Sequence, residues 1–296
     1  MLTPQQRNLC RPGLERLKNP ILSLVRLAGM LYLTGPFPVL EELLAEMGEP
    51  LETGGIRYED PQRLLTPFLP AMRPFERIKN PQEPSRIIVD ENLLAADQFS
   101  ALDSWVSQNV LTQELEAINS LLCGPCRCTL CCTGPAPDAS QEFFEIPLSA
   151  EEVSLFPLNR VDTPESRQAT PEDEPPLANN GSPFYRQPSS LYHWLNGWSM
   201  ILPRQSRCPH LDPESGGCLI YPQRPDVCRR PQIFPYMLER YPDLDREYGD
   251  RLLPAFVIRG KLLAVWDCPY VRAFQDEIGT YAQHCALEPI FKENKT

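Results

Sequence analysis

Five cysteines lie within ten residues of this chain, and three more follow at equal spacing further along. Thiolates packed this closely cross-link, take part in redox chemistry or hold a soft metal ion. The residues after Met1 contain neither the basic nor the apolar segment of a secretory signal, so we expect a cytoplasmic, reducing environment. There, structural disulfides are rare and clustered cysteines more often bind metal or cycle through redox states. Metal binding is the leading interpretation for these cysteines, which are Cys123, Cys126, Cys128, Cys131, Cys132, Cys208, Cys218 and Cys228.

The spacing of the thiols indicates more than one metal ion or a polynuclear cluster. Two residues between thiols allow a turn to direct both at one ion, as in zinc knuckles and iron–sulfur loops. Adjacent residues such as Cys131 and Cys132 usually point apart, so we expect that they seldom hold the same ion. Eight thiols can supply two four-thiolate sites, or one iron–sulfur cluster with thiols left over, and both zinc and iron accept such ligands. The eight candidates are Cys126, Cys128, Cys131, Cys132, Cys208, Cys218, Cys228 and Cys268.

Other polar residues lie close to the thiols in the sequence. His210, two residues after Cys208, is a further candidate ligand. Arg224 and Arg229 are within a few residues of Cys228. We expect their guanidinium groups to donate hydrogen bonds to loop carbonyls and to offset the negative charge of the thiolates. The alternative is an anion or carboxylate pocket beside the metal.

The order of the cysteines and their neighbours resembles the YkgJ-type cysteine-cluster family, a zinc- or iron-chelating domain of the CxxCxxCC type. The resemblance covers roughly residues 120–270 and implies metal chelation. The family pattern begins with Cys-x2-Cys, whereas this chain has Cys-x-Cys with an additional thiol upstream, so either Cys123 or Cys126 is the first ligand. The matching segments are Cys126-x-Cys128-x2-Cys131-Cys132, Cys208-Pro-His-Leu, Gly-Cys218-Leu-Ile-Tyr-Pro-Gln-Arg-Pro-Asp-Val-Cys228-Arg and Asp-Cys268-Pro.

The resemblance also implies an alternative function. A few relatives resemble lysine methylases of flagellin, so the chain is either a metal-binding protein that acts in structure, metal handling or partner binding, or an iron–sulfur or iron-dependent enzyme. In the enzyme, one iron should keep a coordination position that the protein does not fill, because closed four-thiolate sites are typically structural. The sequence contains neither a glycine-rich phosphate loop nor a His-Glu-x2-His zinc protease motif.

Composition and charge restrict the partners. The 42% hydrophobic and 23% charged content is ordinary for a soluble globular protein. The net charge of −11 disfavours non-specific binding to nucleic acid or anionic lipid, because both need a cationic surface. The longest apolar stretch, residues 20–33, is interrupted by Arg26 and is too short to span a bilayer. We expect no nucleic acid and no membrane span, and leave a protein partner open.

The elements that position the thiols should be short, because 34 prolines interrupt the chain. We predict an α+β fold with two parts: a helical N-terminal region over residues 1–119, and a loop-rich cysteine module over 120–296 with short strands and a C-terminal helix. Residues 160–190 are rich in proline and carry an acidic run, which predicts an exposed, mobile insertion. Cys10 and Cys285 stand alone and should be buried as small hydrophobic residues.

Local patterns predict the individual elements. Apolar residues at helical spacing predict several helices. The predicted helix at 90–122 leads directly into Cys123. A capping box predicts a short helix at 149–155, and an aromatic-rich segment predicts a strand or hairpin at 191–202. Two apolar runs around Arg259-Gly260 predict a hairpin at 255–266. The other predictions are helices at 20–33, 38–47, 90–122 and 269–286, and a strand at 143–148.

Overall fold

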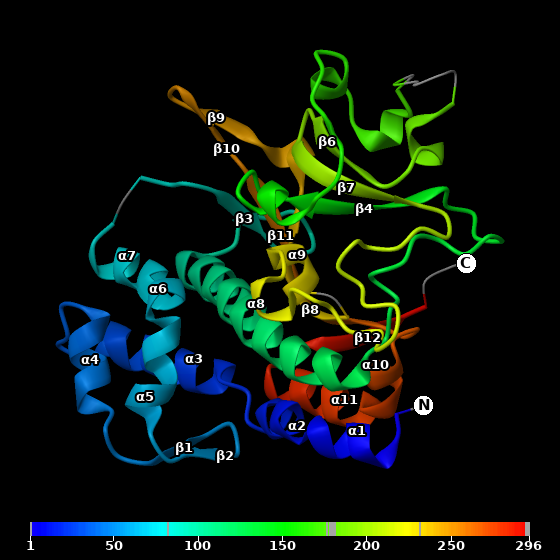
Figure 1. The fold of residues 1–296 in the computed structure, drawn as a ribbon. Coiled ribbons are helices and arrows are strands. Elements are labelled where there is room, and N and C mark those ends of the chain that lie inside the picture. The colour runs from blue at the N-terminus through cyan, green and yellow to red at the C-terminus, as the bar shows by residue number, and fades with distance from the viewer. Residues whose placement is uncertain (1, 82, 176, 178–181, 231, 294–296) are drawn as a thin grey trace.

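A computed structural model of the chain describes residues 2–81, 83–175, 177, 182–230 and 232–293. A long helix, α8 (Gln98–Cys126), crosses the molecule, and helices of the N-terminal region and of the C-terminus pack beside it (Figure 1). The Asp97 side chain caps its first turn by accepting a hydrogen bond from the Ser100 N–H group. Residues at intervals of three or four positions are buried along α8: Val106, Val110, Leu111, Leu115, Ile118 and Leu122.

The N-terminal region is helical, as predicted. The helices expected at 20–33 and 38–47 are α3 (Leu22–Thr34) and α4 (Leu40–Glu46). Between α4 and α8, where prolines recur, each element has only three to five residues, but α8 with its 29 residues contradicts the prediction that the elements positioning the thiols are short. The remaining elements of this region are α1 (Pro4–Leu9), α2 (Arg11–Lys18), β1 (Leu51–Thr53), β2 (Ile56–Tyr58), α5 (Pro61–Leu65), η1 (Thr66–Phe68), α6 (Leu69–Met72), η2 (Arg73–Phe75) and α7 (Glu76–Lys79).

The main sheet packs against α8 through its strand β8 (Ile233–Arg240). Asn119 donates a hydrogen bond of 2.7 Å from Nδ2 to the Ile233 carbonyl, which fixes the beginning of β8 on the helix. The centre of the sheet is β11 (Ala255–Val265), which is antiparallel to β8. On its other edge β11 runs parallel to β3 (Ile87–Val89) and β12 (Glu288–Lys292). The C-terminal helix prediction is met by α10 (Pro269–Ala273) and α11 (Gln275–His284).

The prediction of a hairpin at 255–266 is wrong. These residues form the single strand β11, with a bulge between Ile258 and Lys261. Gly260 has φ +59°, so its left-handed conformation serves the bulge and not a reversal of the chain. The hairpin of this region comes earlier, after η8 (Pro242–Leu244), and consists of β9 (Arg246–Tyr248) and β10 (Arg251–Leu253).

A second, smaller sheet carries the segments around the cysteines. Its strand order is β4-β7-β6-β5, with β4 (Phe143–Leu148) at one edge and the pair β6 (Ser190–Trp194) and β7 (Gly197–Pro203) in the middle. The strand predicted at 143–148 and the hairpin expected at 191–202 are confirmed. The capping box at Ser149 is present, but the helix that it opens, η3 (Glu152–Leu155), is only one 3₁₀ turn. The last strand of this sheet is β5 (Arg160–Val161).

The segment predicted to be a mobile insertion contributes buried residues. Ser166 in η4 (Ser166–Gln168), Pro171 in η5 (Pro171–Asp173) and Phe184 in η6 (Phe184–Arg186) are buried. Residues 176 and 178–181 of this segment lie outside the described residues. The mobility of residues 160–190 stays a prediction.

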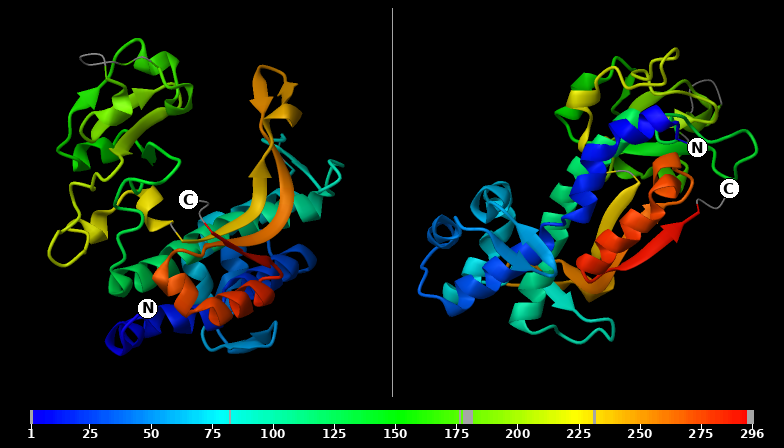
Figure 2. Two further views of the ribbon diagram at one scale, coloured as in Figure 1. Left: turned by 90° about the vertical axis from the view of Figure 1, so that its right-hand side faces the viewer. Right: turned by 90° about the horizontal axis from the view of Figure 1, so that it is seen from below.

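Three hydrophobic cores hold the described part of the chain together. The main core surrounds α8 and includes residues from Leu2 to Leu287. Two smaller cores lie on the faces of the second sheet, one around Met200 and one around Trp194. The cysteine-bearing loops run between the end of α8 and this second sheet (Figure 2). The domain boundary predicted between residues 119 and 120 falls inside α8. None of the described helices is long and apolar enough to cross a membrane.

Candidate metal centre

Three cysteines converge where α8 ends. Cys126 is the last residue of α8, Cys128 follows it, and Cys268 is the residue that precedes α10. Arg127 between the first two has φ +53°, and this left-handed residue ends the helix and turns Cys128 back toward Cys126. The three Sγ atoms lie within 4.8 Å of one another. We call this group the thiol trio.

The thiol trio belongs to the main core, and hydrogen bonds link its members. Cys268 is fully buried and Cys126 is 6% exposed. Hydrogen bonds from Cys128 and Cys268 stabilise the Cys126 thiolate and lower its pKa to about 3. The same hydrogen bonds raise the pKa of the Cys128 and Cys268 thiols. A bound metal ion would replace these two protons and take three thiolates at once.

Five further thiols, together with Cys123 and with Cys128 of the trio, line a cavity of about 330 Å³ between the end of α8 and the second sheet. We call it the thiol hollow. Its walls are fixed locally: the Cys208 N–H donates to the Cys132 carbonyl at 2.8 Å, Leu211 forms an isolated bridge with Cys218, and Cys228 lies in the short helix α9 (Asp226–Arg229). The five thiols are Cys131, Cys132, Cys208, Cys218 and Cys228.

The expectation that Cys131 and Cys132 point apart is wrong. Their Sγ atoms are 3.9 Å apart, close to the ~3.8 Å that separates two thiolates on one tetrahedral zinc ion. The Cys132 N–H donates to the Thr129 carbonyl at 2.8 Å, so the chain turns here instead of extending, and adjacent side chains meet. The hydrogen bond between the two thiols lowers the pKa of Cys131 and raises that of Cys132.

Burial and the charges of neighbouring thiols raise the pKa of two other thiols of the hollow. Burial and, after it, the charges of Cys131 and Cys208 together raise the pKa of Cys228 to about 12. Burial also raises the pKa of Cys208. Negative charges on these sulfur atoms therefore repel one another, which is the electrostatic arrangement that a cation relieves.

Cys123 lies between the two groups. It lines the thiol hollow, one helical turn before Cys126 on α8. Burial and, after it, the charges of Cys131, Cys128 and Cys126 together raise its pKa to about 12. The sequence left Cys123 and Cys126 as alternative first ligands, and the structure places both of them beside other thiols.

The two arginines proposed to assist the thiols have different positions. Arg224 is 7% exposed and lines the hollow, stacks on the Tyr221 ring with 3.7 Å to its centroid, and donates to Ser120 Oγ at 2.8 Å. Its charge lowers the pKa of Cys123 and Cys228, against the larger effect of burial. Arg229 is more exposed and pairs with Asp226.

His210 also lines the hollow. Its Nε2 is 2.7 Å from the Leu155 carbonyl oxygen. A carbonyl oxygen only accepts hydrogen bonds, so Nε2 carries the proton and Nδ1 is the nitrogen that remains for a metal. Cys10 and Cys285 are buried in the main core away from both thiol groups, as expected, and all eleven cysteines are free thiols.

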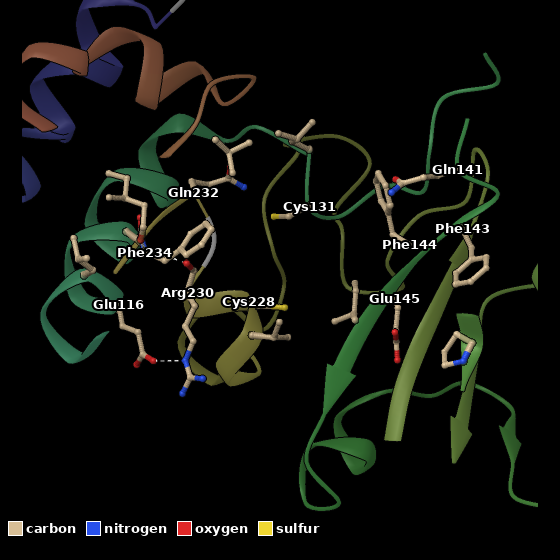
Figure 3. A pocket seen from close by; sticks show the side chains of 18 of the residues that line it. Glu116, Cys131, Gln141, Phe143, Phe144, Glu145, Cys228, Arg230, Gln232 and Phe234 are labelled. Carbon is tan, nitrogen blue, oxygen red and sulfur yellow. Dashed lines mark hydrogen bonds and ion pairs between the residues drawn. The ribbon is translucent and has the colours of Figure 1, made fainter. Parts of the chain in front are cut away.

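A second cavity, of about 960 Å³, adjoins the thiol hollow (Figure 3). It lies between β4 on one side and α8, α9 and the start of β8 on the other. Cys131 and Cys228 line both cavities. The sequence analysis did not predict this cavity, because its walls come from segments that lie far apart along the chain. The only local signal was Glu145, a charged residue within the apolar run of β4.

The comparisons with known proteins agree with this geometry. Residues 122–251 match the family model CxxCxxCC, described as "Putative zinc- or iron-chelating domain". The matched segment is similar to this family, and it includes all the thiols of both groups except Cys268, which lies beyond it. No curated protein and no solved structure matches the chain. The family match and the three converging thiols together support a metal-chelating protein.

Proposed function

We propose that this protein holds two thiolate centres of zinc or iron, and that these centres join the second sheet to the helical body. The observation that carries the proposal is the convergence of Cys126, Cys128 and Cys268 to within 4.8 Å. These residues come from the end of α8 and from the start of α10, so one ion bound by them would close the main core. Three soft thiolates in a buried site suit zinc or iron and do not suit magnesium or calcium.

The first centre is the thiol trio with Cys123 as its fourth ligand. Cys123 precedes Cys126 by three residues on α8, which puts both side chains on one face of the helix. After burial, the charges of Cys131, Cys128 and Cys126 raise the pKa of the Cys123 thiol, so it lies near both members of the trio on this side as well as near Cys131. Four thiolates complete the tetrahedral shell that a structural zinc ion or an iron–sulfur cluster takes.

The second centre is in the thiol hollow, with ligands drawn from Cys131, Cys132, Cys208, Cys218 and Cys228. Cys208 and Cys228 pack against the core of the second sheet. A metal at this centre would hold the loops between the sheet and α8 in one arrangement. Arg224 would offset the excess negative charge, since its guanidinium group lies beside the same thiols.

An iron–sulfur or iron-dependent enzyme is the second candidate. It is favoured by one observation: Cys131 and Cys228 line the large cavity as well as the hollow. A metal ligated there would have a cavity large enough for a substrate beside it. Five thiols around one ion also exceed the four that a closed site needs, so ligand exchange at this centre is chemically plausible.

Purification without oxygen, followed by elemental analysis and a visible absorption spectrum, tests both candidates. We expect zinc or iron at about two atoms per chain for mononuclear centres and about four or more iron atoms for a cluster. Broad absorption near 400 nm would assign iron–sulfur, and its absence with stoichiometric zinc would assign the structural role. A folded preparation that contains no metal, with every thiol open to titration, would refute the proposal.

Proton release gives a second measure. At pH 7 the thiols of Cys123 and Cys228 are protonated, because their pKa values are raised to about 12 in the metal-free protein. Metal uptake must displace these protons, so the apparent affinity rises with pH. Zinc added to apo-protein in weak buffer should release several protons per ion, measured with a pH indicator. A release near zero would show that the ion binds elsewhere.

A further inference from the structure

The large cavity beside the thiol hollow runs along an open edge of the second sheet. β4 is the outer strand of this sheet and pairs only with β7 among the described strands. Residues 140–146 line the cavity without interruption. An outer strand offers a row of backbone donors and acceptors to another chain. The walls of the cavity are thus arranged along an extended backbone.

The register shows which backbone groups point into this space. The Arg204 N–H donates to the Glu142 carbonyl at 3.0 Å, so residue 142 belongs to the set bonded to β7. In an antiparallel pair, alternate residues bond to the partner strand and the others direct their groups away. Phe143 and Glu145 therefore direct N–H and C=O groups away from β7. No described residue outside the sheet bonds to these groups.

The cavity is strongly acidic. Five glutamates and one arginine are the charged residues that line it. Arg230 pairs with Glu116 at 2.6 Å, and Arg204 from outside the cavity pairs with Glu142 at 3.3 Å. None of the described arginine, lysine or histidine side chains forms an ion pair with the other three glutamates of the cavity. These are Glu145, Glu172 and Glu174, of which Glu174 accepts a hydrogen bond from the Tyr185 hydroxyl.

A buried polar group also lacks a partner in this cavity. Gln232 is 5% exposed and lines the cavity at the start of β8 (Figure 3). Its Oε1 atom has no hydrogen-bond partner among the described residues. A buried amide oxygen without a donor costs about 1–3 kcal/mol. A ligand that carries a hydrogen-bond donor would remove this cost.

We propose that this cavity binds an extended peptide segment with basic side chains, which adds to the open edge of β4 as a further strand. The backbone of the segment pairs with Phe143 and Glu145, its lysine or arginine side chains meet Glu145 and Glu172, and a donor reaches Gln232. Pro147, at the next outward position, has no N–H group and marks the end of the edge that can pair fully. The inference goes beyond the proposed metal function by defining the class of partner.

The volume of the cavity indicates that its ligand is a peptide and not a metal ion. A volume of about 960 Å³ is at the upper end of ordinary ligand cavities and far above the need of a hydrated ion. Aromatic residues at its walls, Phe144 and Phe234 among them, suit the aliphatic stems of long basic side chains. Another copy of this chain is a weaker candidate, because each copy carries a net charge of −11.

Fluorescence anisotropy with a labelled seven-residue peptide of alternating lysine and threonine tests the proposal on the metal-loaded protein. We expect saturable binding that weakens at least tenfold when the lysines are acetylated, because the acidic wall then loses its partner. N-methylation of alternate backbone amides should also weaken binding at least tenfold, because it removes the donors needed for strand pairing. Spermidine, a cation without a peptide backbone, should compete only weakly.

Matched variants place the binding in the cavity. The double substitution Glu145→Gln with Glu172→Gln should weaken binding at least tenfold and reduce its dependence on salt. The control, Glu46→Gln with Glu49→Gln, removes the same charge from exposed positions at and after the end of α4 and should bind as the wild type does. Circular dichroism checks that each variant is folded.

Several outcomes would overturn the proposal. Equal binding by the N-methylated peptide, or spermidine binding as tightly as the peptide, would show that the cavity recognises free cations only. Unchanged binding in the Glu145/Glu172 variant would place the peptide elsewhere. Metal content is measured on the same samples: normal metal without peptide binding refutes this inference alone, whereas a folded protein without metal refutes the proposed function.

Discussion

The thiol trio and the thiol hollow differ in what surrounds them. Cys126 and Cys268 of the trio are buried within the main core, on elements that many other residues hold in place. The thiols of the hollow are only partly buried and lie on loops, with Cys228 in a four-residue helix. Metal at the trio is therefore expected to stabilise the whole protein, whereas metal at the hollow should stabilise mainly the attachment of the second sheet.

The largest effect should come from the trio. We expect Cys268→Ser to abolish metal at this centre and to lower the free energy of unfolding by several kcal/mol, because ligation is there part of folding. Urea denaturation with elemental analysis measures both. Cys285→Ser is the control, because Cys285 is equally buried in the same core but belongs to neither thiol group. It should cost about 1 kcal/mol and keep all metal. A similar decrease in the free energy of unfolding in Cys268→Ser and Cys285→Ser would show that Cys268 stabilises the protein through its burial alone.

An intermediate effect is expected at the hollow. Cys228→Ser should lose the metal of the hollow, keep that of the trio, and lower the free energy of unfolding by about 1–3 kcal/mol. Hydrogen exchange should become faster in β4, β6 and β7 and stay unchanged in α8, since only the second sheet depends on this centre. Faster exchange throughout α8 would mean that the two centres form one unit.

Sequence reasoning located the thiols but could not divide them between the two groups. The clustering of Cys123 to Cys132 is a local property, so it was visible without a fold. The separation of Cys128 from Cys131 depends on the left-handed Arg127 and on the turn at Thr129, which bring Cys131 and Cys132 together. Neither conformation has a reliable sequence signal for arginine or threonine.

The fold was predictable to a similar extent. Helices α3 and α4 and strand β4 follow from local periodicity and stop signals, and they lie where the pattern placed them. β11 was predicted as a hairpin, because a glycine between two apolar runs is common to both a turn and a bulge. Only pairing with β8, β3 and β12 decides between them, and that pairing is not local.

A smaller effect is expected at Arg224. Its guanidinium group stacks on Tyr221 and donates to Ser120, which connects the hollow to α8. Arg224→Lys keeps the charge but loses the planar stack, and should lower the free energy of unfolding by about 1 kcal/mol and speed the release of metal from the hollow. Transfer of zinc to a chromogenic chelator measures the release. Arg229→Lys, at the exposed pair with Asp226, is the control and should change the release rate little. Equal rates of zinc release in Arg224→Lys and Arg229→Lys would show that Arg224 does not help to hold the metal of the hollow.

An effect at alkaline pH only is expected at a buried group of the main core that lies outside both thiol groups. Glu114 accepts hydrogen bonds from the Tyr281 hydroxyl at 2.7 Å and from the Ile21 N–H at 2.9 Å, and burial raises its pKa from 4.5 to about 7. A carboxyl group whose pKa is raised by folding favours the folded state most below pH 4.5, and this contribution is lost as the pH rises toward 7. Glu114→Gln keeps one acceptor oxygen for the Ile21 N–H group, places an NH₂ group that can donate to the Tyr281 hydroxyl oxygen at the other position, and cannot ionise.

Wild type and Glu114→Gln should therefore have similar stability at pH 5, and the variant should be more stable at pH 8 by about 1–3 kcal/mol. Urea denaturation of the metal-loaded proteins at the two pH values measures the difference. Both proteins carry the same thiols, so the pH dependence of metal binding cancels in the comparison. If the free energy of unfolding changes equally between pH 5 and pH 8 in wild type and Glu114→Gln, Glu114 ionises as readily in the folded protein as in the unfolded chain. A divergence of the predicted sign would show that the main core tolerates a titrating group without help from either metal centre.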